Sequence, residues 1–194
     1  METILTIDFD VIMWPSIELY NNKIQGDVDR MEEIEKGIPL LKYANADLEL
    51  YQTLTNYLLK AKDNGSEFYF IDTHEKALNY ITEPCALINI DHHHDLGYSK
   101  SQWEDKNLIA CGNWVYRGIK DGKIKKYMWL CDFTSISPFN LQEDVGLIET
   151  CVNATNFDQL IIPKKIIICS SFMWIPTAIR PLYFLWEDLL ERKE

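Results

Sequence analysis

Three of the chain's four histidines stand in a row within one acidic cluster, Asp91-His92-His93-His94-Asp95. This cluster directly follows the apolar run Ala86–Ile90, which is typical of a buried β-strand. Two further apolar runs end in the same kinds of side chain: His74 follows residues 68–71, and Asp8-Phe9-Asp10 follows residues 4–7. Carboxylates and imidazoles together are the ligands of a divalent-metal site with mixed oxygen and nitrogen donors. The sequence therefore predicts a metal site built from the ends of three strands.

The spacing within these motifs indicates which side chains converge. In extended backbone alternate side chains share one face, so Asp91, His93 and Asp95 form one convergent set. Asp8 and Asp10 form a second pair by the same geometry. Such a set suits two Mn²⁺ ions roughly 3.5–4 Å apart. The predicted metal ligands are Asp8, Asp10, His74, Asp91, His93 and Asp95, with Asp72 as a rival to His74.

Other interpretations of these motifs stay open at this point. An aspartate at a strand end is commonly a cap or turn residue. Three adjacent histidines also fit a solvated loop or a site for a single metal ion.

Composition narrows the classes of partner. The 194 residues are 47% hydrophobic and 25% charged, as in an ordinary globular protein, so we expect a single domain over residues 1–194. The formal net charge of −11 argues against a nucleic-acid partner and favours a cationic one such as a basic peptide, although it also serves solubility.

No apolar stretch approaches the ~20 residues that span a bilayer. The five cysteines contain no CxxC pair, so we expect a cytoplasmic protein with reduced thiols.

Predicted strands and helices alternate along the chain. Strands are predicted at residues 3–7, 68–71, 86–90, 126–131 and 165–169, and helices at 28–36, 46–62, 75–81, within 107–118 and at 177–192. This order predicts an α/β fold, a three-layer sandwich with a mostly parallel sheet. In such folds ligands gather at the carboxyl ends of the strands, where Asp8, His74 and Asp91 all fall.

The motifs resemble those of the arginase-like ureohydrolases. Asp91-His92-His93-His94-Asp95 is similar to their Asp-x-His-x-Asp signature, Asp8-Phe9-Asp10 to their Asp-x-Asp pair, and His74 to a histidine one strand earlier. The resemblance is closest to the small bacterial peptide arginases, through residues 7–10, 90–98 and 111–115. In typical arginases the Asp-x-Asp pair follows the other motif, so an arginase-like fold here would have a permuted motif order.

This resemblance implies a hydrolase with two Mn²⁺ ions that converts arginine in a precursor peptide to ornithine and urea. Water activated by the ions would attack the guanidinium carbon, and Asp95 would carry a proton to the leaving amine. His92 and His94 would orient ligands or shuttle protons. Asn113 and Trp114 are candidates to line the substrate entrance; the alternative is a helix N-terminus with a core tryptophan. The candidates for the acid that holds the guanidinium are Glu18 and Glu49.

Two other classes of protein compete with this interpretation. Phosphoesterases of the DHH family carry an Asp-x-Asp pair, a middle aspartate and an Asp-His-His motif in the same order. Against this class, no glycine-rich run follows the cluster, and acidic charge suits a phosphate substrate poorly. The third class is a non-catalytic metal-binding or partner-binding module with tryptophans at an interface. The residues that the DHH interpretation uses are Asp8, Asp10, Asp72, Asp91, His92 and His93.

Overall fold

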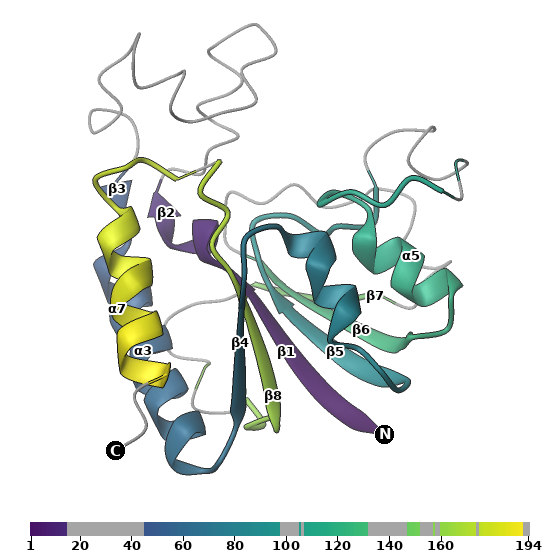
Figure 1. The fold of residues 1–194 in the computed structure, drawn as a ribbon, viewed down its shortest axis with the longest axis horizontal. Coiled ribbons are helices and arrows are strands. Elements are labelled where there is room, and N and C mark those ends of the chain that lie inside the picture. The colour runs from purple at the N-terminus through teal and green to yellow at the C-terminus, as the bar shows by residue number, and fades with distance from the viewer. Residues whose placement is uncertain are drawn as a thin grey trace, which may run out of the picture.

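The computed structural model describes residues 1–14, 45–97, 105, 107–131, 147–151, 157, 160–173 and 175–191. Six strands form one sheet in the order β4-β8-β1-β5-β6-β7, and every pairing in it is parallel (Figure 1). The strands are β1 (Glu2–Asp8), β4 (Glu67–Ile71), β5 (Cys85–Ile90), β6 (Ile124–Cys131), β7 (Leu147–Cys151) and β8 (Lys165–Cys169). The five predicted strands are all present, and β7 is an addition.

The central strands form because their sequences are nearly continuous apolar runs, as expected of parallel strands that are covered on both faces. β1 lies between β5 and β8, with Ile7 opposite Ile90 on one side and Asp8 opposite Cys169 on the other. The carboxyl ends of β1, β5 and β8 therefore reach the same edge of the sheet. β4 lies beside β8, with Ile71 opposite Cys169, so its carboxyl end reaches that edge as well.

Helices cover both faces of the sheet. On one face lie α3 (Leu48–Asp63) and α7 (Arg180–Glu191), and on the other lie the 3-10 helix η3 (His74–Asn79) and α5 (Trp114–Lys120) (Figure 1). Helix α3 forms because the Asp47 carboxylate caps it by accepting from the Leu50 amide at 2.9 Å. Its apolar residues recur every three or four positions and face the sheet. The arrangement agrees with a three-layer α/β sandwich.

Two hydrophobic cores lie on the two faces of the sheet. In the first, Phe9 packs edge-on against Tyr183 and Trp186 of α7, with ring centroids 5.3 and 5.1 Å apart. In the second, Trp114 at the start of α5 and Trp129 of β6 are fully buried. Both cores approach the carboxyl edge of the sheet, so the side chains at that edge rest on rigid packing from either face.

Several elements differ from the sequence-based predictions. The helix predicted at 75–81 is the 3-10 helix η3, which begins one residue earlier at His74. The helices predicted within 107–118 and at 177–192 begin only at Trp114 and Arg180. A short ribbon of β2 (Met13–Trp14) and β3 (Asn45–Ala46) was not predicted. The helix predicted at 28–36 and Glu18 lie outside the described residues. Among the described helices, none has the length and apolarity to cross a membrane.

Candidate metal centre

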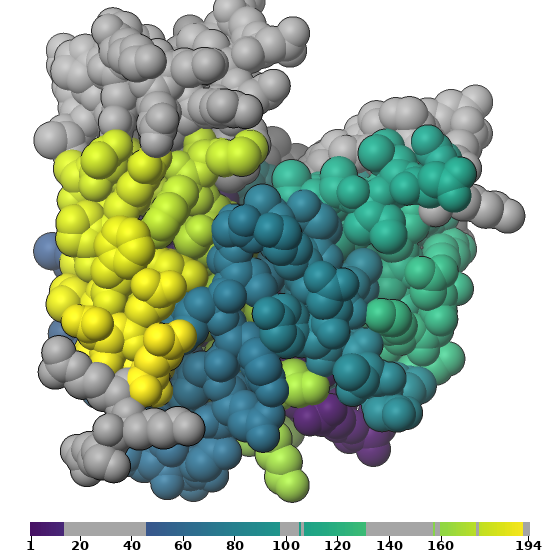
Figure 2. Space-filling model, viewed as in Figure 1, coloured from purple at the N-terminus to yellow at the C-terminus, as the bar shows by residue number. Residues whose placement is uncertain are grey.

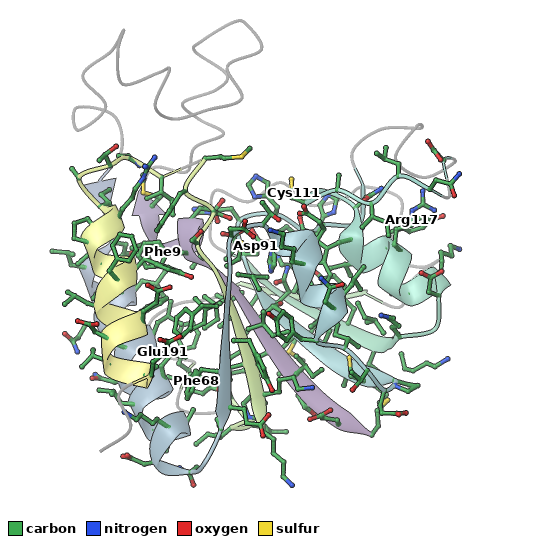
Figure 3. All side chains as sticks on the ribbon, in the orientation of Figure 1. Phe9, Phe68, Asp91, Cys111, Arg117 and Glu191 are labelled. Atoms are coloured by element: carbon green, nitrogen blue, oxygen red, sulfur yellow. The ribbon has the colours of Figure 1, made fainter. Side chains whose placement is uncertain are left out.

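Two groups of carboxylates and imidazoles meet at the carboxyl edge of the sheet, close to the labelled Asp91 (Figure 3). The first group is Asp8, His74 and Asp91, and the second is Asp10, Asp91 and His93. Within each group the potential ligand atoms all lie within 4.8 Å of one another. Residues from β1, η3 and the segment after β5 therefore converge, as the strand order predicts, and Asp91 belongs to both groups.

Turns, and not extended backbone, bring these ligands together. The Asp91 Oδ1 atom accepts from the His93 amide at 2.8 Å, and the Asp8 Oδ1 atom accepts from the Asp10 amide at 3.4 Å. Asp8 also stands at the N-cap of the 3-10 helix η1 (Phe9–Ile12). Both motifs thus fold as tight turns in which the first aspartate binds the amide two residues on. The prediction that alternate side chains share the face of a strand was wrong in its geometry, although Asp8, Asp10, Asp91 and His93 do belong to the two groups.

The two oxygens of Asp91 face two different histidines. Its Oδ2 atom lies 3.2 Å from the His74 Nδ1 atom, and its Oδ1 atom lies 3.4 Å from the His93 Nδ1 atom. Burial opposes ionisation of Asp91, but the contacts and charges of His74 and His93 outweigh burial and lower its pKa. A carboxylate with its oxygens directed to opposite sides is suited to bridge two cations.

His74 faces more carboxylates than hydrogen bonding can satisfy. Its Nδ1 atom lies 3.3 Å from Asp8 Oδ2, 3.2 Å from Asp91 Oδ2 and 3.1 Å from Asp95 Oδ2. One ring nitrogen carries at most one hydrogen, so it could donate to no more than one of these oxygens, and it forms no hydrogen bond with any described residue. Burial favours the neutral imidazole, yet the three carboxylates outweigh burial and raise the pKa of His74 well above its ordinary value. This crowding is what a shared cation would relieve.

Asp10 is the clearest sign that a positive group belongs in the cluster. Its side chain is buried, and neither of its oxygens accepts a hydrogen bond from any residue that the structure describes. Burial, together with the charges of Asp8 and Asp91, raises the pKa of Asp10 well above its ordinary value. A buried carboxylate without a donor is costly unless a cation pairs with it. Two divalent ions would balance the four buried carboxylates of Asp8, Asp10, Asp91 and Asp95.

Asp95 is held in place by the helix that follows it. Its backbone has a φ of 52°, a left-handed conformation that is uncommon for a residue other than glycine. Its carbonyl oxygen accepts from the amides of Val115 and Tyr116, and its Oδ2 atom accepts from the Trp114 indole N–H at 2.5 Å. Burial and the charge of Asp91 raise the pKa of Asp95 to about 7. Asp95 therefore lies beside the first group, oriented by α5.

Trp114 is expected to position Asp95. Replacing Trp114 by Phe keeps the aromatic ring that packs against His74, at a centroid distance of 4.8 Å, but removes the donor to Asp95. We expect Mn²⁺ affinity, measured by titration calorimetry, to fall roughly 10–100-fold, as for the loss of other groups that orient metal ligands.

The matched control for this substitution is Trp186→Phe. It removes an indole N–H that donates to Thr55 Oγ1 at 2.7 Å in the other core. This control is expected to lower stability and leave Mn²⁺ affinity unchanged. Equal loss of affinity in both variants would contradict a specific role for Trp114.

A polar network beneath the cluster escaped sequence analysis. Asn89 is fully buried within β5, and its Nδ2 atom donates to Asp91 Oδ2 and to the Tyr127 hydroxyl, both at 3.3 Å. Thr6 donates to the Asn89 Oδ1 atom at 2.6 Å, and the Trp129 indole donates to the Asp91 carbonyl at 2.9 Å. The available signal was a lone asparagine inside the apolar run Ala86–Ile90. The hydrogen bonds from Asn89 and Trp129 hold the side chain and the backbone of Asp91 in place.

The remaining histidines of the motif are buried. His94 accepts from the Leu96 amide at 3.0 Å through its Nδ1 atom and packs edge-on against Trp129. Burial and the charge of His93 lower the pKa of His94 to about 4, so its ring stays neutral near pH 7. His92 is buried beside His93. Catalytic roles for His92 and His94 stay predictions.

Asn113 and Trp114 are placed as the second sequence interpretation describes, at a helix N-terminus with a core tryptophan. Asn113 directly precedes α5 and is fully buried. Its Oδ1 atom accepts a hydrogen bond from the Ala110 amide at 2.8 Å, and its Nδ2 atom donates one to the Leu108 carbonyl at 3.0 Å. Trp114 has no exposed surface. Their described contacts therefore support the loop and Asp95, and a direct contact with substrate stays a prediction.

Two of the acidic residues predicted as site candidates lie outside the cluster. A third acidic residue, Glu75, was not predicted from the sequence. Asp72 is exposed and pairs with Lys76 at 2.5 Å, so His74 and not Asp72 belongs to the candidate groups. Glu49 is exposed in the first turn of α3. Glu75, directly after His74, has a buried Oε2 atom with no hydrogen-bond partner among the described residues.

Comparisons with known proteins leave the site to be interpreted from its own geometry. No family model matches the chain, and neither a curated protein nor a solved structure is significantly similar to it.

Proposed function

We propose that the protein is a hydrolase that uses two divalent cations, Mn²⁺ by preference, to remove the guanidino group of arginine within a peptide. The observation that carries this proposal is the sharing of Asp91 between two buried ligand groups. A pair of cations bridged by one carboxylate is the arrangement that hydrolases use to activate water for attack on an unreactive carbon. The motifs that resemble those of peptide arginases supply the choice of substrate, and with it an arginase-like fold in permuted order.

The side chains of the cluster suit the proposed cations. Carboxylate oxygens and imidazole nitrogens are ligands that Mn²⁺ accepts, and thiolates are absent from both groups of described residues. Asp8 and His74 would hold one ion, Asp10 and His93 would hold the other, and Asp91 would contact both. When bound, the two ions would supply the Lewis acidity that lowers the pKa of water toward neutrality.

The protein's own groups would bind the substrate and move protons. Glu75 offers a buried carboxylate oxygen without a partner among the described residues, which suits a planar cationic group beside the cluster. Asp95, oriented by Trp114 and 3.1 Å from His74, would take a proton from the attacking water and deliver it to the leaving amine. The products would be urea and a peptide with ornithine in place of arginine.

The position of Asp72 favours this proposal over a phosphoesterase of the DHH type. That alternative needs a middle aspartate in the cluster, but the Asp72 side chain is 67% exposed and is paired with Lys76. His74, and not Asp72, lies within the cluster.

A direct test incubates the Mn²⁺-loaded full chain with an arginine-containing peptide and, separately, with a generic phosphodiester. We expect urea release together with the mass change of arginine to ornithine, and no cleavage of the diester. Metal analysis should find two ions per chain. Cleavage of the diester would support the phosphoesterase instead. Two bound ions without either reaction would indicate a non-catalytic metal-binding module.

A further inference from the structure

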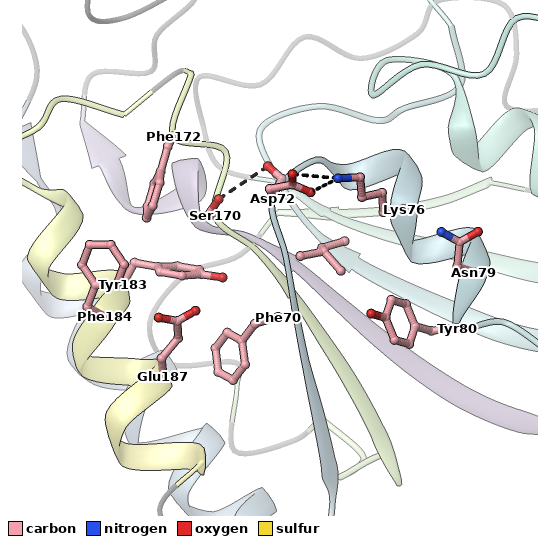
Figure 4. Close-up of a pocket in the computed structure, with 11 residues that line it drawn as sticks. Phe70, Asp72, Lys76, Asn79, Tyr80, Ser170, Phe172, Tyr183, Phe184 and Glu187 are labelled. Atoms are coloured by element: carbon pink, nitrogen blue, oxygen red, sulfur yellow. Dashed lines mark hydrogen bonds and ion pairs between the residues drawn. The ribbon is translucent and has the colours of Figure 1, made fainter.

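A groove of about 470 Å³ lies along the outer side of β4, between α7 and η3 (Figure 4). Phe70 and Ile71 of β4 form its floor, and Tyr183, Phe184 and Glu187 of α7 form one wall. Lys76, Asn79 and Tyr80 line the opposite side. Figure 2 shows α7 and the β4–η3 segment next to each other on one face of the molecule. The groove thus follows the edge of the sheet.

The backbone of β4 is available for pairing along this edge. The Glu67 amide donates to Lys164 and the Ile71 carbonyl accepts from Ser170, so the odd-numbered residues of β4 direct their backbone groups toward β8. Phe68 and Phe70 must therefore direct their N–H and C=O groups away from β8. Among the described residues no strand pairs with this side of β4. An unpaired edge of this kind is a template for an added strand.

The groove carries a negative charge among aromatic rings. The Glu187 carboxylate points between Phe70 and Tyr183, whose rings meet edge-on at 5.8 Å (Figure 4). No described residue forms a hydrogen bond or ion pair with Glu187. Phe184 is 50% exposed at the rim. An acidic group beside apolar surface suits a lysine or arginine side chain, whose aliphatic stem packs while its charged end pairs.

The groove and the metal centre begin at the same strand end. β4 ends at Ile71, Asp72 closes the groove through its ion pair with Lys76, and His74 enters the cluster two residues later. An extended chain that lies along β4 would therefore lead toward the carboxyl edge of the sheet. There the proposed reaction takes place.

We propose that an extended, basic peptide segment binds along β4 as an added strand, pairs with the backbone of Phe68 and Phe70, and places a cationic side chain on Glu187. This proposal rests on the proposed function in one respect: the segment would belong to the peptide whose arginine reaches the metal centre. The backbone pairing would supply affinity for an extended chain of any sequence, and Glu187 would supply the preference for a basic one.

Binding is tested with a fluorescein-labelled peptide of alternating valine and lysine, which favours extended backbone and contains no arginine to hydrolyse. Fluorescence anisotropy with the Mn²⁺-loaded full chain gives the dissociation constant. Glu187→Gln is expected to weaken binding roughly two- to fivefold, the usual worth of a partly exposed ion pair. Glu187→Lys is expected to weaken it further. Glu191→Gln, on the same helix but outside the groove lining, is the matched control and should bind like the unmodified protein.

A scan of single N-methyl groups along the peptide tests the strand pairing without altering the protein. Methylation of an amide that faces β4 removes one hydrogen bond and should weaken binding roughly three- to tenfold. Methylation of the next amide should have little effect, so the scan should alternate along the peptide. No binding, a flat scan, or a dissociation constant that does not change with Glu187→Lys would overturn the proposal.

The two experiments distinguish a failure of the proposed peptide binding from a failure of the proposed hydrolase activity. Urea release from an arginine peptide, with a flat methylation scan, would refute the docking and leave the hydrolase intact. An alternating scan without urea release would refute the hydrolase and leave a peptide-binding groove.

Discussion

Replacing Asp91 by Asn is expected to abolish binding of both proposed cations and to lower the rate of the proposed urea release on the order of 10³-fold, the upper range for loss of one stabilising group in an active site. The substitution preserves the size of the side chain but removes the negative charge that faces His74 and His93 at 3.2 and 3.4 Å. Metal content per chain and the initial rate with an arginine peptide are the two measurements.

The exposed aspartate next to the site provides the control for this prediction. Asp72→Asn removes an equal charge two residues before His74, but this side chain pairs only with Lys76 at the surface in the described structure. It should retain both ions. An Asp91→Asn protein that still held one ion at full affinity would mean that Asp91 serves only one group.

Removing the cations with a chelator is expected to lower the free energy of unfolding by about 2.7 kcal/mol or more when the free ion had been at 100 times its dissociation constant. The cause is the repulsion among the four buried aspartates that the ions offset. Denaturant unfolding with and without Mn²⁺ measures this difference. An unchanged midpoint would contradict a metal centre at this edge of the sheet.

Asp10→Asn is expected to stabilise the protein when the cations are absent. In the chelated protein the substitution is expected to raise the free energy of unfolding by about 1–3 kcal/mol, because it removes an unsatisfied buried carboxylate. The new amide can also donate to the neighbouring carboxylates of Asp8 and Asp91. In the presence of Mn²⁺ the same variant should gain less stability than the unmodified protein. A loss of stability under both conditions would show that Asp10 is a packing residue.

Much of this site was predictable from the sequence because strand ends in a parallel sheet share an edge. Apolar runs identified β1, β4 and β5, and polar residues at or shortly after the ends of these strands form the two groups of the candidate site. β7 was missed because Leu147–Cys151 contains a central glutamate and only a short apolar pair. A five-residue run of that kind does not distinguish a strand from a loop.

The parts that could not be predicted depend on contacts between distant residues. No local pattern pairs the Trp114 indole with Asp95, 19 positions away, or places Asn89 beneath Asp91 and against Tyr127. The convergence of Asp8 and Asp10 was expected from strand geometry, whereas the Asp8 cap of η1 turns the chain first. Glu75 was not predicted because no pattern in the adjacent sequence indicates that its Oε2 atom is buried.

The position of β8 has a consequence for when the proposed metal centre can form during synthesis. β8 follows all the proposed ligands in the chain, yet it is inserted between β1 and β4, the strands that deliver Asp8 and His74. A nascent chain that has not yet released residues 165–169 from the ribosome lacks the element that sets the spacing of those two side chains. Parallel pairings between such distant segments also form slowly. If the proposed cations bind at this edge, their binding would therefore be a late event, which would follow translation of the proposed ligands by at least the time needed to make the last strand.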